Sequence, residues 1–243
     1  MIIRIEKNNK ILYGEGVFHH NTNKTLVLCH GLNTDHNYPL MKSIYTSFQD
    51  KYNVFCFDFR GQGQSSGDFH EITLNKQIDD IQDIMMYLKE TYQIDLKDIT
   101  LIGHSQGGCD AMLWAARTNA HLAHLILLSP GFGIVHACQE GSFAGIPFDL
   151  ATMGDHLELL LGCVLPREYI EEARQFNLEE EFKDYTYPVS IFYSPSDELV
   201  SLEDLARGTN YLKNKQMYEF DTNHHYSDKY QEVNDSIRHI LEK

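Results

Sequence analysis

The sequence has no long apolar run: none of its uninterrupted hydrophobic stretches approaches the roughly 20 residues that a membrane-spanning helix needs. Its first residues lack the apolar stretch of a secretory signal and indicate a short strand instead. The five cysteines are scattered and without C-x-x-C spacing, which favours reduced, buried thiols over a disulfide framework. These features together predict a cytoplasmic protein that has no membrane partner.

Positive charge is also scarce. The 243 residues include 20 Lys and Arg against 35 Asp and Glu, which gives a formal net charge of −15. Nucleic-acid binding requires a basic surface, so this balance argues against a nucleic-acid partner. Hydrophobic residues make up 42% of the chain, as is ordinary for a folded globular protein. We predict a single domain over residues 1–243, because no linker divides the chain and α/β folds routinely reach this length.

Short runs rich in β-branched and aromatic residues alternate with segments of helical periodicity. This alternation predicts an α/β fold whose mainly parallel sheet is covered by helices on both faces. The expected strands cover residues 1–7, 10–19, 25–29, 54–57, 99–102, 125–128, 189–193 and 216–220. The expected helices cover residues 38–50, 78–88, 111–116, 202–212 and 230–241.

Residues 133–187 break this rhythm. They contain a Gly-rich start and two helical segments, expected at 156–161 and 167–176, but no pattern of a core strand. The stretch is too long for a simple connection. We therefore predict an insertion, a cap over about residues 134–184, that lies over the carboxyl edge of the sheet, where folds of this class bind ligands.

The most informative motif is Gly103-His104-Ser105-Gln106-Gly107, a G-x-S-x-G sequence placed directly between an expected strand and an expected helix. The chemistry needs a serine on a strained turn, where its hydroxyl stands free at the sheet edge and the glycines let neighbouring backbone pass without a Cβ clash. The helix N-terminus that follows favours developing negative charge. Ser105 is therefore the predicted nucleophile, and the alternative is a glycine-rich turn with an incidental serine.

A serine nucleophile needs a base, and the base needs an orienting acid. After such a motif the acid and base are expected in the order Asp, His, each just past a late strand. Asp197 follows the strand expected at 189–193, with Glu198 as the neighbouring alternative. His224 and His225 follow the last strand, and by position either could be the base. Because the base must be neutral, activity should rise with pH around ~6.5.

The tetrahedral intermediate also needs N–H donors. One is expected from the backbone of Gln106, the residue after the nucleophile, and the second from the loop after an early strand. That loop contains His30-Gly31-Leu32, so the Leu32 backbone is the predicted second donor; the plain alternative is that His30-Gly31 only forms a turn. The 13 histidines show no H-E-x-x-H or comparable ligand spacing, so we expect no metal and no cofactor.

Together with Asp58-Phe59-Arg60-Gly61-Gln62-Gly63-Gln64-Ser65, these motifs resemble the α/β-hydrolase superfamily, in the same order and over nearly the whole chain. The resemblance implies an α/β-hydrolase fold with an eight-stranded sheet and a cap after the sixth strand. It also implies that Asp58, Arg60 and Ser65 brace the oxyanion loop rather than act in catalysis.

Within the superfamily, the sequence is most similar to small bacterial feruloyl (cinnamoyl) esterases. Residues 167–173 resemble a segment of their cap, and His224-His225-Tyr226 resembles their H-x-[FY] ending, which selects His224 as the base. Two stretches depart from these esterases: Leu32-Asn33-Thr34, where they have an aromatic residue and then a glycine, and Tyr193-Ser194, where His-Gly is common. Neither departure touches the triad, but both bear on the acyl pocket.

The resemblance implies a serine carboxylic-ester hydrolase with a Ser105–His224–Asp197 triad, acting on hydroxycinnamoyl-type or other small esters. Acylglycerol lipases, thioesterases and serine peptidases use the same constellation, and a non-catalytic ligand-binding homologue is a further alternative. By resemblance, Tyr169 is expected to bind a substrate phenol. Phe132 and His30 are the other expected substrate contacts. The expected partner is a small-molecule ester, and a homodimer is left open.

Overall fold

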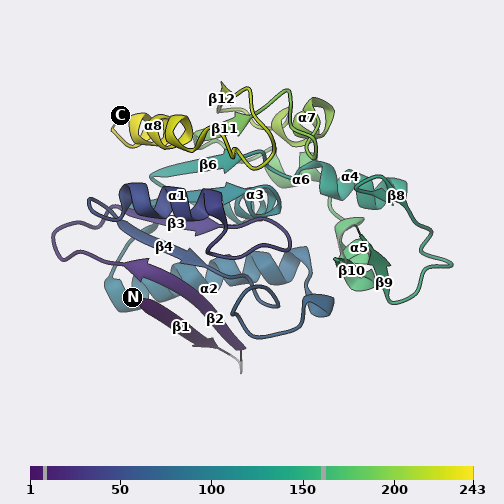
Figure 1. Cartoon of the computed structure of the whole chain (residues 1–243), viewed down its shortest axis with the longest axis horizontal. Helices are drawn as coiled ribbons and strands as arrows, with labels where there is room; N and C mark the ends of the chain where they lie inside the picture. The colour runs from purple at the N-terminus through teal and green to yellow at the C-terminus, as the bar shows by residue number, and fades with distance from the viewer. Residues whose placement is uncertain (8–9, 160–162, 243) are drawn as a thin grey trace.

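An eight-stranded sheet forms the centre of the computed structural model, which describes residues 1–7, 10–159 and 163–242 (Figure 1). Its strands lie in the order β1-β2-β4-β3-β5-β6-β11-β12. β2 pairs antiparallel with β1 and with β4, and the other neighbouring pairs within the described sheet are parallel. The strands are β1 (Ile2–Lys7), β2 (Lys10–Val17), β3 (Thr25–Cys29), β4 (Asn53–Phe57), β5 (Ile99–His104), β6 (His124–Leu128), β11 (Val189–Tyr193) and β12 (Lys215–Glu219). The prediction of a mainly parallel eight-stranded sheet is confirmed.

Strand β3 shows why this sheet must be covered on both sides. All five of its residues are buried. Leu26 and Leu28 belong to a hydrophobic cluster on one face, whereas Val27 and Cys29 belong to the cluster on the other face. Because side chains alternate between the two faces of a sheet, a strand that is buried at every position needs cover on both sides.

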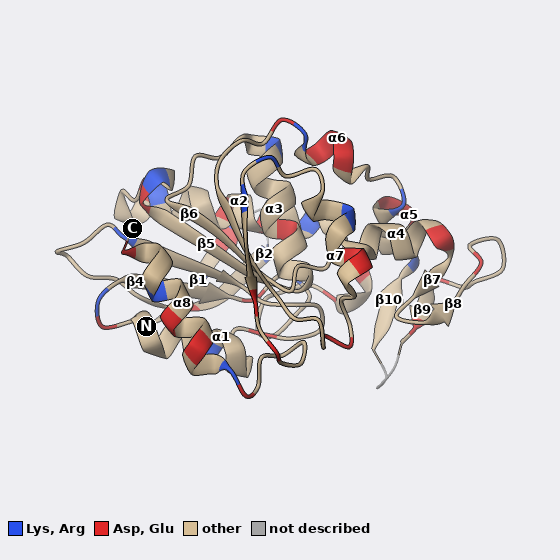
Figure 2. Cartoon of the chain, turned by 90° about the horizontal axis from the view of Figure 1, so that it is seen from above, with Lys and Arg blue, Asp and Glu red and all other residues tan. Residues whose placement is uncertain are grey.

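Two pairs of helices supply this cover. α1 (Pro39–Phe48) and α8 (Tyr230–Leu241) pack side by side on the face that holds Leu26 and Leu28 (Figures 1 and 2). α2 (Leu74–Tyr92) and α3 (Gln106–Thr118) pack together on the opposite face. α7 lies between β11 and β12 in the chain, and two 3-10 helices precede α2 and β5. Their bounds are Leu202–Thr209 (α7), Phe69–Glu71 (η1) and Leu96–Asp98 (η2).

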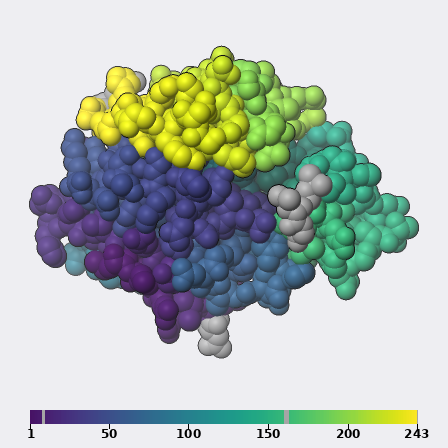
Figure 3. Space-filling view, in the orientation of Figure 1, coloured from purple at the N-terminus to yellow at the C-terminus, as the bar shows by residue number. Residues whose placement is uncertain are grey.

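The chain between β6 and β11 forms a group of short elements at one end of the sheet, coloured teal to green in Figures 1 and 3. These elements are α4 (Gly133–Glu140), β7 (Ser142–Phe143), β8 (Ile146–Pro147), β9 (His156–Glu158), β10 (Val164–Pro166), α5 (Arg167–Ala173) and α6 (Leu178–Phe182). β7 pairs with β8 and β9 pairs with β10, both antiparallel. α5 contacts α4 and α2, which attaches this group to the helical layer. The role of about residues 134–184 as a cap stays a prediction, as does the single-domain assignment.

The helix expected at 156–161 is wrong over its first three residues. His156–Glu158 form strand β9, in which Leu157 is buried between two exposed neighbours. This alternation is that of a strand, and the pairing with β10 supplies the backbone hydrogen bonds. Leu159 belongs to no helix or strand, and residues 160 and 161, the end of the expected helix, lie outside the described residues. The helix expected at 167–176 is also shorter, since α5 ends at Ala173.

All five cysteines are free thiols, and four of them are buried. Among the described helices, none combines the length and apolar character needed to cross a membrane.

Candidate active site

Ser105 lies on a sharp turn between β5 and α3. Its backbone adopts φ 54° and ψ −123°, a conformation that is costly for a residue with a Cβ atom. The flanking glycines make this turn possible: a Cβ atom on Gly103 would lie 2.3 Å from the Gly107 carbonyl oxygen, and one on Gly107 would lie 2.2 Å from the His30 carbonyl oxygen. The G-x-S-x-G motif therefore packs directly against the loop that contains His30.

Main-chain hydrogen bonds fix this turn to the neighbouring strand. The Ser105 N–H donates to the Leu128 carbonyl at 2.9 Å, and the Ser105 carbonyl accepts from the Gly131 N–H at 2.8 Å. Both partners belong to the end of β6 and the turn after it, which leads into α4. The strained backbone of Ser105 is thus held by contacts to the adjacent strand, while its side chain is partly exposed.

Asp197 and His224 form a buried pair. His224 Nδ1 lies 2.9 Å from Asp197 Oδ2 and 3.0 Å from Oδ1, and the two side chains are 3% and 1% exposed. The Asp197 Oδ1 atom also accepts hydrogen bonds from the N–H groups of Leu199 and Val200, each at 2.9 Å. Glu198, the alternative acid, instead accepts the main-chain N–H of His224 at 3.1 Å. The His224 ring therefore contacts Asp197, whereas the Glu198 carboxylate bonds the main-chain N–H of His224.

The surroundings of Asp197 keep its carboxylate ionised. Burial alone would raise its pKa, but hydrogen bonding and charge from His224, with hydrogen bonds from Ser129 and the Val200 N–H, lower the pKa to about 2. Ser129 is in turn held by Tyr226, whose hydroxyl lies 3.1 Å from Ser129 Oγ. The aromatic residue of the expected H-x-[FY] ending thus contacts a residue that helps to lower the pKa of the acid.

His104 links the Asp197–His224 pair to the serine turn. The rings of His104 and His224 are 4.8 Å apart between centroids, and the His104 Nε2–H donates to the His224 carbonyl at 2.9 Å. Burial, and next the proximity of His224, lowers the pKa of His104 to about 3, so its ring is neutral. No hydrogen bond joins Ser105 Oγ to the His224 ring within the described residues. Catalytic contacts of this kind commonly tighten only when substrate binds.

The two predicted N–H donors, of Leu32 and Gln106, lie on segments that meet beside Ser105. A Cβ atom on Gly31 would lie 3.2 Å from Ser105 Cβ, so the loop that carries Leu32 passes directly over the serine. Gln106 begins α3 immediately after Ser105. In the part of the chain that the structure describes, the N–H groups of Leu32 and Gln106 donate to no protein acceptor. Two such N–H groups beside the serine are what an oxyanion requires.

His30, predicted as a substrate contact, is fully buried with both ring nitrogens engaged. Its Nδ1–H donates to the Gly31 carbonyl at 2.7 Å, and its Nε2 accepts the Phe59 N–H at 3.1 Å. These bonds require the neutral ring, and burial lowers the pKa of His30 in agreement. In this structure the ring supports the loop before Leu32 and presents no surface to a ligand.

The segment after β4 braces the same loop. Asp58 Oδ1 accepts the main-chain N–H of His36 at 2.6 Å and its ring Nδ1–H at 2.8 Å. Gln62 Oε1 accepts the N–H of Asn33 at 2.7 Å. The interpretation of Asp58 as a structural residue is thus supported by its contacts. Arg60 is directed elsewhere, to an ion pair with the buried Asp80 of α2.

Phe132 and Tyr169 are both fully buried. Phe132 lines a cavity of about 290 Å³ between α4, α6 and α7, together with residues such as Val135 and Tyr211, and Ser105 is not among the lining residues. The Tyr169 hydroxyl donates to Gln106 Oε1 at 2.9 Å, so in this structure it is occupied by a protein partner.

Sequence reasoning missed Gln77, which accepts a hydrogen bond from the other end of the Gln106 amide. No motif or spacing distinguishes it from the rest of the buried face of α2.

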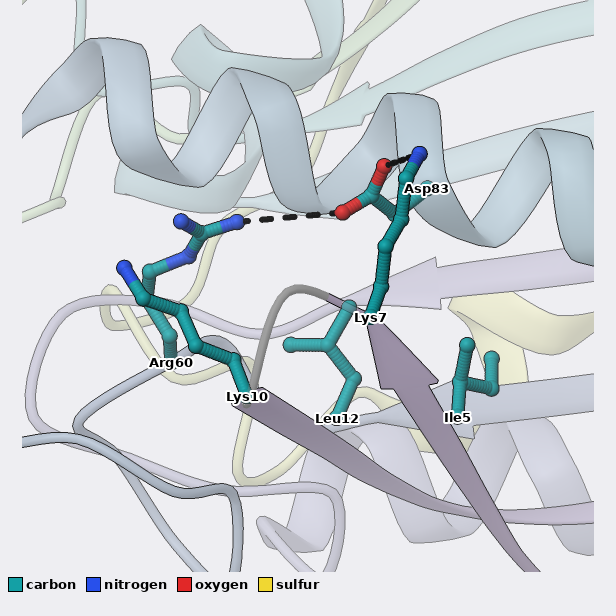
Figure 4. Close-up of a pocket in the computed structure, with 6 residues that line it drawn as sticks. All are labelled: Ile5, Lys7, Lys10, Leu12, Arg60 and Asp83. Atoms are coloured by element: carbon teal, nitrogen blue, oxygen red, sulfur yellow. Dashed lines mark hydrogen bonds and ion pairs between the residues drawn. The ribbon is translucent and has the colours of Figure 1, made fainter.

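A second cavity, of about 90 Å³, lies at the edge formed by β1 and β2 (Figure 4). Lys7, Lys10 and Arg60 line it together with the apolar Ile5 and Leu12, and the dashed lines mark the ion pairs of Lys7 and Arg60 with Asp83. None of the predicted catalytic residues is among those that line it. Across the described residues, no three His, Cys, Asp or Glu side chains are grouped so that they could hold a metal ion.

The strand order and the serine turn define an α/β hydrolase. A family model described as Serine aminopeptidase, S33, matches residues 20–153, which is more than half of the chain. The chain therefore belongs to this family of α/β hydrolases, and the predicted resemblance to the superfamily is confirmed.

Curated relatives match the chain over shorter stretches. "Putative esterase/lipase 2" of Mycoplasma pneumoniae is 27% identical over 113 residues, which cover 46% of this chain and 39% of that protein. Proline iminopeptidase PfmaB of Pestalotiopsis fici is 31% identical over 98 residues, which cover 40% of this chain and 32% of that protein. The chain thus matches about a third of the length of these relatives.

Solved structures match over nearly the whole chain. Est1E from Butyrivibrio proteoclasticus, in a structure with ferulic acid bound, is 25% identical with a TM-score of 0.90, covering 98% of this chain and 97% of that one. The Pyrococcus furiosus esterase Pf2001 is 19% identical with a TM-score of 0.73, and the match covers 100% of this chain and 91% of that one. The second match shows likeness of fold alone.

Proposed function

We propose that this protein is a serine carboxylic-ester hydrolase that works through an acyl-enzyme. The observation that carries the proposal is the buried Asp197–His224 pair beside the strained Ser105 turn. A neutral histidine held by an ionised carboxylate is the base that a serine nucleophile requires.

In the first step, Ser105 Oγ attacks the ester carbonyl carbon while His224 Nε2 takes the hydroxyl proton. The N–H groups of Leu32 and Gln106 bind the oxyanion. As the intermediate collapses, the bond to the alcohol breaks and His224 returns the proton to the departing oxygen. Water then attacks the acyl-enzyme with His224 as the base, the acid is released, and Ser105 regains its proton. Asp197 orients the His224 ring and stabilises its protonated form throughout.

The proposed substrates are hydroxycinnamoyl-type or other small esters. Support comes from the likeness to Est1E, whose structure was determined with ferulic acid bound and which matches over nearly the whole chain. The predicted phenol contact, Tyr169, is engaged by Gln106 here, so recognition of a phenol would rest on other residues or on rearrangement of this contact.

A serine peptidase is the second candidate function. Two observations favour it: the family is described as Serine aminopeptidase, S33, and one relative is named a proline iminopeptidase. Peptide and ester hydrolysis share the acyl-enzyme route, so the same triad would serve both.

A substrate panel tests both proposals. It comprises ethyl ferulate, p-nitrophenyl acetate and butyrate, a monoacylglycerol, an acyl-CoA and a prolyl p-nitroanilide, each assayed with the wild-type protein and with Ser105→Ala. We expect the fastest turnover on an ester and a loss of about 10³-fold or more in Ser105→Ala. Preferential cleavage of the prolyl amide would replace the esterase assignment by the peptidase. Equal turnover by Ser105→Ala, with unchanged folding, would refute both.

A further inference from the structure

The side-chain amide of Gln106 is held at both ends inside the protein. Its Oε1 accepts the Tyr169 hydroxyl at 2.9 Å, and its Nε2 donates to Gln77 Oε1. All three side chains are buried, and each has an exposed fraction of 1% or less. The Tyr169 hydroxyl is a donor here and Gln77 Oε1 is an acceptor, so together they fix which way the Gln106 amide faces.

Gln106 is also the residue whose main-chain N–H is proposed to bind the oxyanion. It is the first residue of α3, directly after the strained Ser105. The turn after β6 confines it from the other side, because a Cβ atom on Gly131 would lie 3.3 Å from the Gln106 nitrogen. Because the Gln106 side chain and the main-chain N–H share one Cα, the contacts that hold the buried side chain also restrict the orientation of the N–H.

Tyr169 comes from α5, within the insertion between β6 and β11. α5 is attached to the start of α2 by two further contacts: Glu172 Oε1 accepts the Asn75 N–H at 2.8 Å, and Glu168 pairs with Lys76 at 3.2 Å. The hydroxyl of Tyr169 then reaches from α5 to the first residue of α3. Through this one side chain, the position of the insertion is connected to the proposed oxyanion donor.

Removing the Tyr169 hydroxyl would leave the buried Gln106 Oε1 without this donor. An unsatisfied buried carbonyl is costly, so the amide would turn to find another partner. One turn along α3 lies the buried carboxyl of Asp110, which already interacts with the Gln106 side chain although its oxygens, among the described residues, lack a well-formed hydrogen bond. In its protonated form, which burial favours, this carboxyl can donate to the Gln106 Oε1 that loses the Tyr169 hydroxyl, so the orientation of the Gln106 amide depends on Tyr169.

We propose that Tyr169 is a positioning residue, which holds the main-chain N–H of Gln106 in place for the oxyanion by hydrogen bonding to the Gln106 side chain. The proposal rests on the esterase function proposed above. It differs from the phenol-binding prediction for Tyr169, because a positioning role affects every ester, whether or not the substrate carries a phenol.

The test measures kcat and KM for ethyl ferulate and for p-nitrophenyl acetate, which has no phenol hydroxyl. We expect Tyr169→Phe to lower kcat on the order of tenfold for both esters, less than the complete loss of an oxyanion donor, and to leave KM within about twofold. Tyr185→Phe is the matched control, since Tyr185 is also buried and donates its hydroxyl to the Ala120 carbonyl at 3.3 Å, away from the serine turn. Its kinetics should equal those of the wild type, and thermal unfolding of each variant checks that it folds.

A double-mutant cycle shows whether Tyr169 acts through Gln106. Gln106→Met keeps the length of the side chain and the main-chain N–H but removes the amide. We expect it to lower kcat like Tyr169→Phe, and we expect the double variant to lose no more than either single variant. If Tyr169→Phe does not fold, the kcat of Gln106→Met alone decides, and an unchanged value contradicts the proposal.

Failure of this inference is distinct from failure of the proposed function. A wild-type protein that hydrolyses no ester refutes the function. An active wild type with unchanged kcat in Tyr169→Phe refutes the positioning role alone. So does a rise in KM for ethyl ferulate only, which would assign Tyr169 to phenol binding instead.

Discussion

His224 Nδ1 lies 2.9 Å from Asp197 Oδ2, while the main-chain N–H of the same histidine bonds the neighbouring Glu198. Two adjacent carboxylates thus hold one residue, but only Asp197 contacts its ring. Because Nδ1 is hydrogen-bonded to Asp197, Nε2 on the opposite side of the ring is the nitrogen that can accept a proton. This division of roles sets the first prediction.

Asp197→Asn should lower kcat for an ester by about 10³–10⁴-fold, because an amide favours the wrong tautomer of the ring and cannot stabilise its protonated form. Glu198→Gln is the matched control. It keeps an acceptor oxygen for the His224 N–H and should change kcat less than about tenfold. Steady-state kinetics on p-nitrophenyl acetate measure both. If the Glu198 variant suffers the larger loss, the acid is misassigned.

On its acidic limb, the pH profile of kcat/KM should reflect the loss of a single proton. The pKa of Asp197 is lowered to about 2 and that of His104 to about 3, so neither group changes charge above about pH 4. Above about pH 4, activity should therefore carry no step from either group, and its rise with pH should have a slope of one. A slope of two between pH 4 and 8 would show that a second group near the serine titrates as well.

Asp110 should make the wild-type protein less stable as pH rises. Burial raises the pKa of its carboxyl well above the ordinary range, whereas in the unfolded chain it titrates near ~3.9. Between these values the folded state holds a proton that the unfolded state has lost, so stability falls as pH increases. Asp110→Asn lacks this dependence. The difference between its midpoint of thermal unfolding and that of the wild type should therefore shift in favour of the variant as the pH rises from 5 to 8. A constant difference across that range would show that the carboxyl is ionised in the fold.

Gly107→Ala should disrupt the contact between the serine turn and the loop that carries Leu32. The added Cβ atom would lie 2.2 Å from the His30 carbonyl oxygen, so one of the two segments must move. We expect a loss of stability of about 1–3 kcal/mol and a lower kcat. Gly154→Ala is the control, since no atom of the described residues lies within 4 Å of a Cβ atom there. Chemical denaturation and ester turnover check both variants, and equal behaviour of the two would contradict the close approach.

The sequence predicts most of the fold because its strands are buried on both faces. In the run Thr25–Cys29, four consecutive apolar residues follow Thr25, and this pattern suits a covered parallel strand. His156–Glu158 carries no comparable signal: it is three residues long, and its strand conformation depends on pairing with Val164–Pro166. Periodicity over so short a stretch does not separate a strand from a helix.

The candidate triad also follows from the sequence, because each member lies in the segment that follows a strand and carries reactive chemistry. The supporting contacts do not. His30 was expected at the substrate, yet its ring bonds the Phe59 N–H, a contact that depends on how two distant loops cross. The role of Gln77 likewise arises only when α2 and α3 pack together and bring its side chain to Gln106.

The central claim is that Ser105 is a nucleophile activated by its surroundings, and a fluorophosphonate probe tests it most directly. Intact-protein mass spectrometry and peptide mapping would follow labelling of the wild type, Ser105→Ala and Asp197→Asn at neutral pH. The account predicts one adduct per chain on Ser105 in the wild type, none in Ser105→Ala and much slower labelling in Asp197→Asn. An unlabelled wild type, or an adduct that persists in Ser105→Ala at the same rate, would contradict it.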